Sequence, residues 1–273
     1  MTVALGLFAA VGWAFVTLRL ASVSRGLDPA VGMLVLLASS LVLTAPLGLA
    51  LDGLPPADGR GLGAAAVAGL LEMTGFLCYL KAVQRGSMAV IAPLIGLEGG
   101  VAAVIAVIGG EAVSATLAVG IVMAALGASL ACAAPGERTA AGAGWALLAG
   151  LQFGVMLTLF GATDELGAFN SVTVARLTAV AVLLPVLAIR GWRPTPRPVL
   201  RRIAECGLVD AISFGAFAAA ATRGPVSVAS VCAAQFSTVA VIVAIVVLRE
   251  RPAPVQLVGI GMTLVGTTVL ASV

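Results

Sequence analysis

Residues 69–79, GLLEMTGFLCY, and residues 207–217, GLVDAISFGAF, are two diverged copies of one pattern. In each copy an acid, Glu72 or Asp210, follows a glycine by three residues inside an otherwise apolar stretch. Helix positions three, four and seven residues apart share a face, so each copy presents a small residue, an acid and aromatic rings as one stripe. An acid in a membrane helix is costly to bury and is a functional candidate by default. The two acids are therefore the first candidates for a site.

The composition indicates a protein that crosses a membrane many times. Of the 273 residues, 61% are hydrophobic and 10% are charged, whereas soluble domains have about 45 to 50% apolar and about 25% charged residues. A run of about 20 apolar residues is long enough to span the hydrocarbon. Gly, Pro and charged residues divide the chain into ten such runs. We therefore predict an all-α membrane protein with ten spans, near residues 3–22, 29–51, 61–81, 87–109, 113–133, 142–162, 168–189, 203–222, 225–248 and 254–272.

The repetition covers the whole chain, at the offset that separates Glu72 from Asp210 or at one position more. We predict two domains, residues 1–136 and 137–273, each with five helices. Because five is an odd number, the second half enters the membrane from the opposite side. Inverted repeats of this kind are common in secondary transporters, which work by alternating access. The matched pairs outside the acid stripes are Pro46 and Pro185, Glu111 and Glu250, Gly120 and Gly259, Met123 and Met262, and Gly127 and Gly266.

Several classes of function are disfavoured by what the sequence lacks. The chain has no His, the usual metal ligand and physiological-pH switch. Its four Cys show no pattern that favours a disulfide or a metal, so we expect no metal site and no cofactor. Zinc-protease, serine-hydrolase and nucleotide-binding motifs are absent. The basic stretch of residues 190–202 is interrupted by prolines and adjoins a span, which favours a role in membrane topology over nucleic-acid binding.

Besides the matched Glu and Gly pairs, the first half has Pro93 and the second half has Gln256, and together these residues carry a resemblance to a known family. Their order resembles the double signature of EamA-type transporters of the drug/metabolite transporter superfamily, in which a Glu starts the Gly-rich fifth helix of each half. The resemblance implies a central cavity lined by helices one, three, four, six, eight and nine, with the fifth and tenth behind. It also implies export or exchange of small metabolites or drugs across a bacterial plasma membrane. The residues are Pro93, Glu111, Gly120 and Gly127, answered by Glu250, Gln256, Gly259 and Gly266.

Three features depart from the family pattern. The first helix has Gly12 before Trp13, where the family tends to have Trp-Gly, and helix two has Leu37 where helix seven has Arg176. The family usually places both termini in the cytoplasm. The positive-inside rule predicts the opposite, because 12 Lys and Arg residues lie on one side of the predicted topology and two on the other. The membrane orientation therefore stays open.

Three acids, Glu72, Glu98 and Asp210, are expected at mid-helix depth. Burying an ionised acid there costs about 2.5 to 3.5 kcal/mol on insertion scales, so each should face water, a partner or a ligand. Proton or cation binding is the favoured interpretation, and a structural hydrogen bond is the alternative. Glu72 and Asp210 should face each other across the axis between the halves. Glu98 has no acidic counterpart, because its repeat position falls on Phe236 or Ser237, and we expect substrate specificity there.

Other candidates are expected around the acids. Arg176, on helix seven outside the predicted cavity, is expected to pair with an acid. Gln152 and Gln235 would bind either a ligand or a neighbouring helix. Aromatic faces beside carboxylates suit organic cations, with ordinary packing as the alternative, and this applies to Phe76, Tyr79, Phe214 and Phe217. Trp13 is a further candidate, expected near the same depth. Glu111 and Glu250 lie at helix starts, where an acid complements the helix dipole, and are expected to be structural.

Three acids against one Arg leave a negative midplane if all ionise. The sequence therefore predicts a secondary transporter, an exporter or exchanger, for a small cationic or zwitterionic organic molecule, with proton coupling left open. The partners are then the small molecule and the lipid bilayer, without nucleic acid, and a monomer and a homodimer are both compatible with the sequence. The alternatives are an intramembrane enzyme or lipid-handling protein, and a membrane partner that transports nothing.

Overall fold

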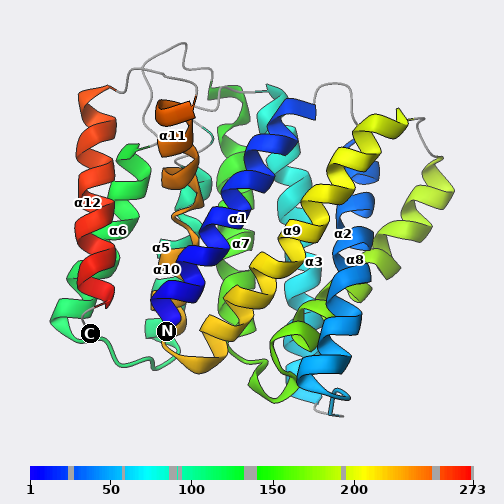
Figure 1. The fold of residues 1–273 in the computed structure, drawn as a ribbon, viewed down its shortest axis with the longest axis horizontal. Coiled ribbons are helices and arrows are strands. Elements are labelled where there is room, and N and C mark those ends of the chain that lie inside the picture. The colour runs from blue at the N-terminus through cyan, green and yellow to red at the C-terminus, as the bar shows by residue number, and fades with distance from the viewer. Residues whose placement is uncertain are drawn as a thin grey trace.

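Long helices lying side by side make up the described part of the chain in the computed structural model (Figure 1). The structure describes residues 1–23, 28–56, 59–85, 91, 94–131, 140–191, 195–247 and 253–271. None of these residues is in a strand, which confirms the all-α fold class. The helices are α1 (Thr2–Val23), α2 (Pro29–Leu47), α3 (Gly59–Arg85), α5 (Glu98–Ile108), α6 (Ala115–Ala131), α7 (Ala143–Phe160), α8 (Ala168–Arg190), α9 (Arg197–Arg223), α10 (Val226–Ala233), α11 (Phe236–Val247) and α12 (Pro254–Ala271), with short helical turns η1 (Gly48–Asp52), η2 (Ala140–Gly142) and η3 (Asp164–Leu166).

Several of these helices can cross a membrane. By length and composition, α1, α2 together with η1, α3, α7, α8 and α9 are all long and apolar enough, which makes six candidates. Four shorter apolar segments, Leu94–Ile108, Ala115–Leu130, Val226–Val239 and Pro254–Leu270, coincide with the other predicted spans. The chain is therefore a helical membrane protein, while the count of ten spans stays a prediction.

Two helices extend beyond their predicted ends. α9 begins at Arg197 rather than near residue 203, and α3 continues to Arg85 rather than ending near residue 81. Pro198 in the first turn of α9 suits a helix start, because its missing N–H has no partner there in any case. The added turns carry exposed charged residues, Arg197 and Arg85 among them. The length of an apolar run therefore underestimates the length of these two helices, because their ends continue beyond the apolar zone.

The helix bounds follow the sequence repeat. α3 and α9 are offset at both ends by the same distance along the chain as Glu72 and Asp210, and the starts of α5 and α11 have this offset too. The starts of α2 and α8 lie one position further apart, as do those of α6 and α12. The offset thus shortens by one position between the second and third helices of each half and lengthens by one again between the fourth and fifth. The predicted boundary between domains 1–136 and 137–273 lies within positions 132–139, outside those described, and stays a prediction.

The fourth helix of each half is interrupted at the equivalent place. A turn at Leu97 precedes α5, and a turn at Ala234 and Gln235 separates α10 from α11. The continuous apolar patterns of residues 87–109 and 225–248 gave no sign of either break. Interrupted helices are the elements from which many transporters build midplane sites.

At one end of the row of helices, α6 packs against α12 (Figure 1). A methyl carbon on Gly127 would lie 2.5 Å from the backbone nitrogen of Thr263, and one on Gly266 would lie 2.5 Å from that of Ala124. Gly127 and Gly266 occupy equivalent positions in the two repeats, so α6 and α12 each contribute a glycine to the same close crossing. The pair corresponds to the fifth and tenth helices, which the family resemblance places behind the cavity.

Two carboxylates of the first half cap helices of the second half. Asp52 accepts hydrogen bonds from the backbone N–H groups of Phe169 (2.7 Å) and Asn170 (2.9 Å) at the start of α8. Glu111 accepts from the N–H of Val226 (2.8 Å) at the start of α10 and also bonds the hydroxyl of Ser227. Glu111 thus acts at a helix start as expected, although the helix is α10 rather than its own α6. Its predicted mate, Glu250, and Pro93 of the family signature lie outside the described residues.

Removing these caps should destabilise the fold. We expect Asp52→Ala and Glu111→Ala each to lower the free energy of unfolding by about 1 to 2 kcal/mol, because each leaves backbone N–H groups without an acceptor. Thermal unfolding of the purified protein in detergent measures the change. Glu165→Ala, at an exposed acid of η3, is the matched control and should leave the melting temperature unchanged. Equal melting temperatures for all three variants would contradict the capping role.

Candidate functional site

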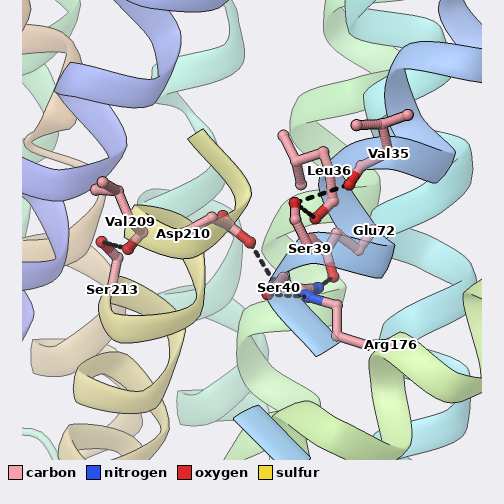
Figure 2. A network of polar contacts seen from close by, with 9 residues as sticks. All are labelled: Val35, Leu36, Ser39, Ser40, Glu72, Arg176, Val209, Asp210 and Ser213. Carbon is pink, nitrogen blue, oxygen red and sulfur yellow. Dashed lines mark hydrogen bonds and ion pairs between the residues drawn. The ribbon is translucent and has the colours of Figure 1, made fainter. Parts of the chain in front are cut away.

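Arg176 of α8 is the centre of a buried polar network that joins four helices (Figure 2). One terminal nitrogen donates to Glu72 of α3, and the other donates to Asp210 of α9 at 2.7 Å. Its Nε donates to the hydroxyl of Ser40 of α2 at 3.0 Å. Arg176 is fully buried, and Glu72 and Asp210 are 5% and 4% exposed. All three guanidinium nitrogens are therefore bonded by protein groups.

The glycines of the two stripes explain why these side chains meet. A methyl carbon on Gly69 would lie 2.1 Å from the carbonyl oxygen of Ala175 in α8, and one on Gly207 would lie 2.4 Å from that of Leu36 in α2. Small residues of this kind let the backbones of membrane helices approach closely. Each stripe therefore crosses the second helix of the other half, and on the α8 side the crossing places Glu72 beside Arg176.

This arrangement extends one expectation and corrects another. Arg176 was expected to pair with an acid from a helix outside the predicted cavity, and it bonds two acids, with the largest side chain among the fully buried residues described. Glu72 and Asp210 were expected to face each other, and instead the guanidinium of Arg176 bonds both. With both acids ionised, the network carries one excess negative charge. The site is thus an ion network shared by the two halves, rather than a pair of acids without a cationic partner.

An aromatic wall covers one side of the network. The Phe214 ring lies 4.4 Å from the guanidinium carbon of Arg176, in the range of a cation–π contact. Trp13 packs on Phe214 at 4.7 Å between ring centroids and on Phe217 at 5.8 Å, and Phe160 contacts both Phe rings. The cation on the Phe214 face is thus the protein's own arginine. The indole N–H of Trp13 is buried in this wall, beside the Asp210 carboxylate.

Glu98 differs from the other two acids. It is 5% exposed and is the first residue of α5, directly after the turn at Leu97. Within the described part of the chain its carboxyl group makes no hydrogen bond or ion pair. A methyl carbon on Gly99 would lie 2.6 Å from the Ala234 side chain, and one on Gly154 would lie 2.9 Å from the Glu98 carbonyl oxygen. Glu98 therefore lies where the start of α5 packs closely against α7 and the C-terminal end of α10.

The two glutamines bond neighbouring protein groups. Gln235, in the turn between α10 and α11, donates to the carbonyl oxygens of Ala124 (3.3 Å) and Val231 (3.0 Å) and accepts from Thr238 (3.2 Å). Gln152 of α7 accepts a hydrogen bond from Thr74 of α3. Both contacts match the helix-bonding alternative for these residues. Among the described residues, neither glutamine bonds the Arg176 network.

Phe76 and Tyr79 pack against each other at 5.6 Å between ring centroids. Tyr79 belongs to an apolar cluster with Ile95 and Ala149, separate from the cluster around Trp13 and Phe214. Its buried hydroxyl has no hydrogen-bond partner among the residues that the structure describes. The aromatic members of the two stripes therefore occupy different surroundings.

Sequence reasoning missed two members of the site, Ser40 and Phe160. Ser40 is a fully buried hydroxyl in an apolar helix, and its repeat position is Ala179. A polar residue present in one copy of the repeat and absent from the other was the available signal. Phe160 is the last residue of α7, and no local pattern distinguishes it from ordinary core.

Comparison with known proteins shows a family and a similar fold. The sequence profile of the EamA-like transporter family matches residues 1–132 and 140–272. A solved crystal structure, described only as that of a protein, is similar with a TM-score of 0.82 and 15% identity, over 99% of this chain and 98% of its own. At that identity the likeness shows the fold alone. No curated protein sequence matches the chain.

Proposed function

Because this chain belongs to the EamA-like transporter family of the drug/metabolite transporter superfamily, we propose that it is a secondary transporter that moves a small organic molecule by alternating access. An intramembrane enzyme is not favoured, because the family is one of transporters. The proposal covers the substrate class, the coupling and the site residues, which are Glu72, Asp210 and Arg176 with Ser40, Trp13 and Phe214 around them.

The observation that carries the proposal is the sharing of Arg176 between the halves. Arg176 and Asp210 come from the second half, and Glu72 and Ser40 from the first. A rocking motion of one half against the other has to break or rearrange these contacts. A ligand that binds the acids better in one arrangement than in the other shifts the population between them. The network therefore has the position and chemistry of a switch between two access states.

The charge of the network favours a cationic or zwitterionic substrate. One guanidinium against two carboxylates leaves an excess negative charge when both acids ionise. A proton or an organic cation would neutralise it, so the two would compete and exchange. A simple anion would add to the excess. The wall of Trp13 and Phe214 would supply an apolar surface beside these acids, with Arg176 already over the Phe214 ring.

The membrane arrangement that goes with this function is ten spans in two inverted halves. The six long candidates, the four shorter apolar segments and the nearly constant offset between equivalent helix starts support it. The start of α1 and the end of α12 lie at the same edge of the molecule in Figure 1, as an even number of spans requires. Labelling of single cysteines placed at residues 2 and 271 with a membrane-impermeant reagent tests the arrangement. Labelling from opposite sides would contradict it, and labelling from one side would also decide the orientation.

Single neutralisation of the acids tests the transport mechanism. We expect Asp210→Asn and Glu72→Gln each to keep a folded protein, because Arg176 retains one acidic partner and the network becomes neutral. Uptake driven by a pH gradient in proteoliposomes should fall about tenfold or more, because the exchangeable charge is gone. The assay uses a substrate found by thermal-shift screening of amines, amino acids and anionic metabolites at two pH values.

Glu205→Gln is the matched control for these variants. Glu205 also lies on α9, but its side chain is 42% exposed and pairs with Arg19 and Arg201 at the surface. Its neutralisation makes the same change in net charge and should leave transport within twofold of wild type. Normal rate and pH dependence in the Glu72→Gln, Asp210→Asn double variant would end the acid-coupled mechanism. Selective stabilisation by anions alone would contradict the proposed substrate class.

A further inference from the structure

We propose that Glu98 binds the ammonium group of the transported molecule, as a subsite separate from the Arg176 network. The inference rests on the proposed transport function and assigns its cationic substrate to a particular carboxylate. Glu72 and Asp210 already share a cation inside the protein. Glu98 is the third acid expected at mid-helix depth, and it pairs with no cation among the described residues.

The described helices around Glu98 contain no charge that could balance it. The helices that pack around α5 are α6, α7 and α10, and none of them contains an Asp, Glu, Lys or Arg residue. α11, which follows the turn at Gln235, has none either. Burying an ionised carboxylate without a partner is costly. An ionised Glu98 therefore needs a positively charged occupant from outside this set of helices.

The backbone around Glu98 suits a binding position. The residue begins α5, where the positive end of the helix dipole favours a carboxylate. The preceding turn at Leu97 interrupts the helix, and half-helix ends of this kind line ion and substrate sites in transporters. The dipole stabilises the anion but does not neutralise it. A bound ammonium group would do so through a charge-assisted hydrogen bond.

The repeat indicates that this position serves specificity rather than the fold. α5 and α11 begin at equivalent residues, and the second half has Phe236 in place of Glu98. The shared architecture therefore forms with an apolar residue at this position. A proton would occupy Glu98 in the empty carrier, and binding of the ammonium group would release that proton to water on the open side. The Glu98 carboxylate thus binds the ammonium group for transport in one direction and a proton for the return.

Carbodiimide labelling of the purified full-length protein tests the assignment. Dicyclohexylcarbodiimide reacts with protonated carboxyl groups in apolar surroundings, and peptide mass spectrometry reports the labelled residue. The probes are primary alkylammonium ions from ethyl to hexyl, amino acids, and the matching neutral alcohols. We expect ammonium compounds to slow labelling of Glu98 and the alcohols to have no effect. In Glu98→Gln, ammonium binding measured by thermal shift should weaken about tenfold or more.

Glu165→Gln, an exposed acid of η3, is the control and should bind like wild type. Labelling of Glu98 that no ammonium compound slows would overturn the proposal. Absence of labelling would overturn it too, because a group that receives the substrate's charge has to be reachable. Unchanged ammonium affinity in Glu98→Gln, with transport still sensitive to Asp210→Asn, would refute this subsite and leave the transporter function standing. Normal transport in both Glu98→Gln and Asp210→Asn would refute the proposed function itself.

Discussion

Replacement of Arg176 by leucine is expected to produce the largest loss of stability of any single charge change in this protein. The guanidinium is fully buried and bonds Glu72, Asp210 and Ser40, so its removal leaves two acids close together without a cation. Breaking a buried ion pair by removing one partner costs about 3 to 5 kcal/mol. Leucine is an appropriate replacement, because Leu37 occupies the equivalent position in the first half. Thermal unfolding and gel filtration in detergent measure the loss of folded protein.

The control for this variant restores charge balance rather than the arginine. Adding Glu72→Gln and Asp210→Asn to Arg176→Leu removes the two uncompensated acids, and neutral replacement of a buried ion network is often tolerated. We expect this triple variant to regain most of the lost stability while remaining inactive in transport. If Arg176→Leu melts at the wild-type temperature, the network contributes nothing to stability. If the triple variant stays as unstable as the single one, shape rather than charge is the cause.

Replacement of Gly69 by leucine is expected to have an effect of similar size, for a steric reason. Even a methyl carbon at this position would lie 2.1 Å from the carbonyl oxygen of Ala175, a backbone atom that a side-chain rotation cannot move away. α3 and α8 would have to separate, which removes Glu72 from Arg176. Overpacking of a core costs about 1 to 3 kcal/mol, and loss of the ion pair adds to this. The melting temperature and the folded yield measure the sum.

Gly63→Leu is the matched control in the same helix. A methyl carbon on Gly63 would meet no atom within 4 Å, and the residue is exposed. This variant should keep the wild-type melting temperature and yield. Gly207→Leu, the repeat mate, should behave like Gly69→Leu, because Gly207 makes the equivalent crossing with Leu36 of α2. A stable Gly69→Leu protein would contradict the close crossing of α3 and α8.

The repeat made much of the fold predictable. Apolar run length located the helices, and the offset between the two halves located the acids, because both signals recur along the chain. The breaks at Leu97 and at Gln235 were not predictable, since hydropathy measures composition and carries no information about the backbone within an apolar run. The overhanging turns of α3 and α9 were missed for the related reason that helices continue into water beyond their apolar part.

The candidate site was predictable only as a set of residues. The stripes identified Glu72 and Asp210, but the position of Arg176 between them depends on which helices cross. That depends on Gly69 and Gly207, whose role as crossing points is visible only in three dimensions. Phe76 and Tyr79 share the sequence pattern of Phe214 and yet pack elsewhere. The periodicity of a single sequence shows which residues share a helix face, but it does not show which other helix packs against that face.

The position of Arg176 in the chain has a consequence for biosynthesis. Glu72 belongs to the third helix, and its cation follows 104 residues later. If the helices enter the membrane in chain order, α3 arrives before α8, and Glu72 is without this cation until α8 follows. Asp210, in contrast, enters after Arg176 is already present. The first half is therefore an incomplete folding unit that depends on continued translation, whereas the second half brings its own counter-ion.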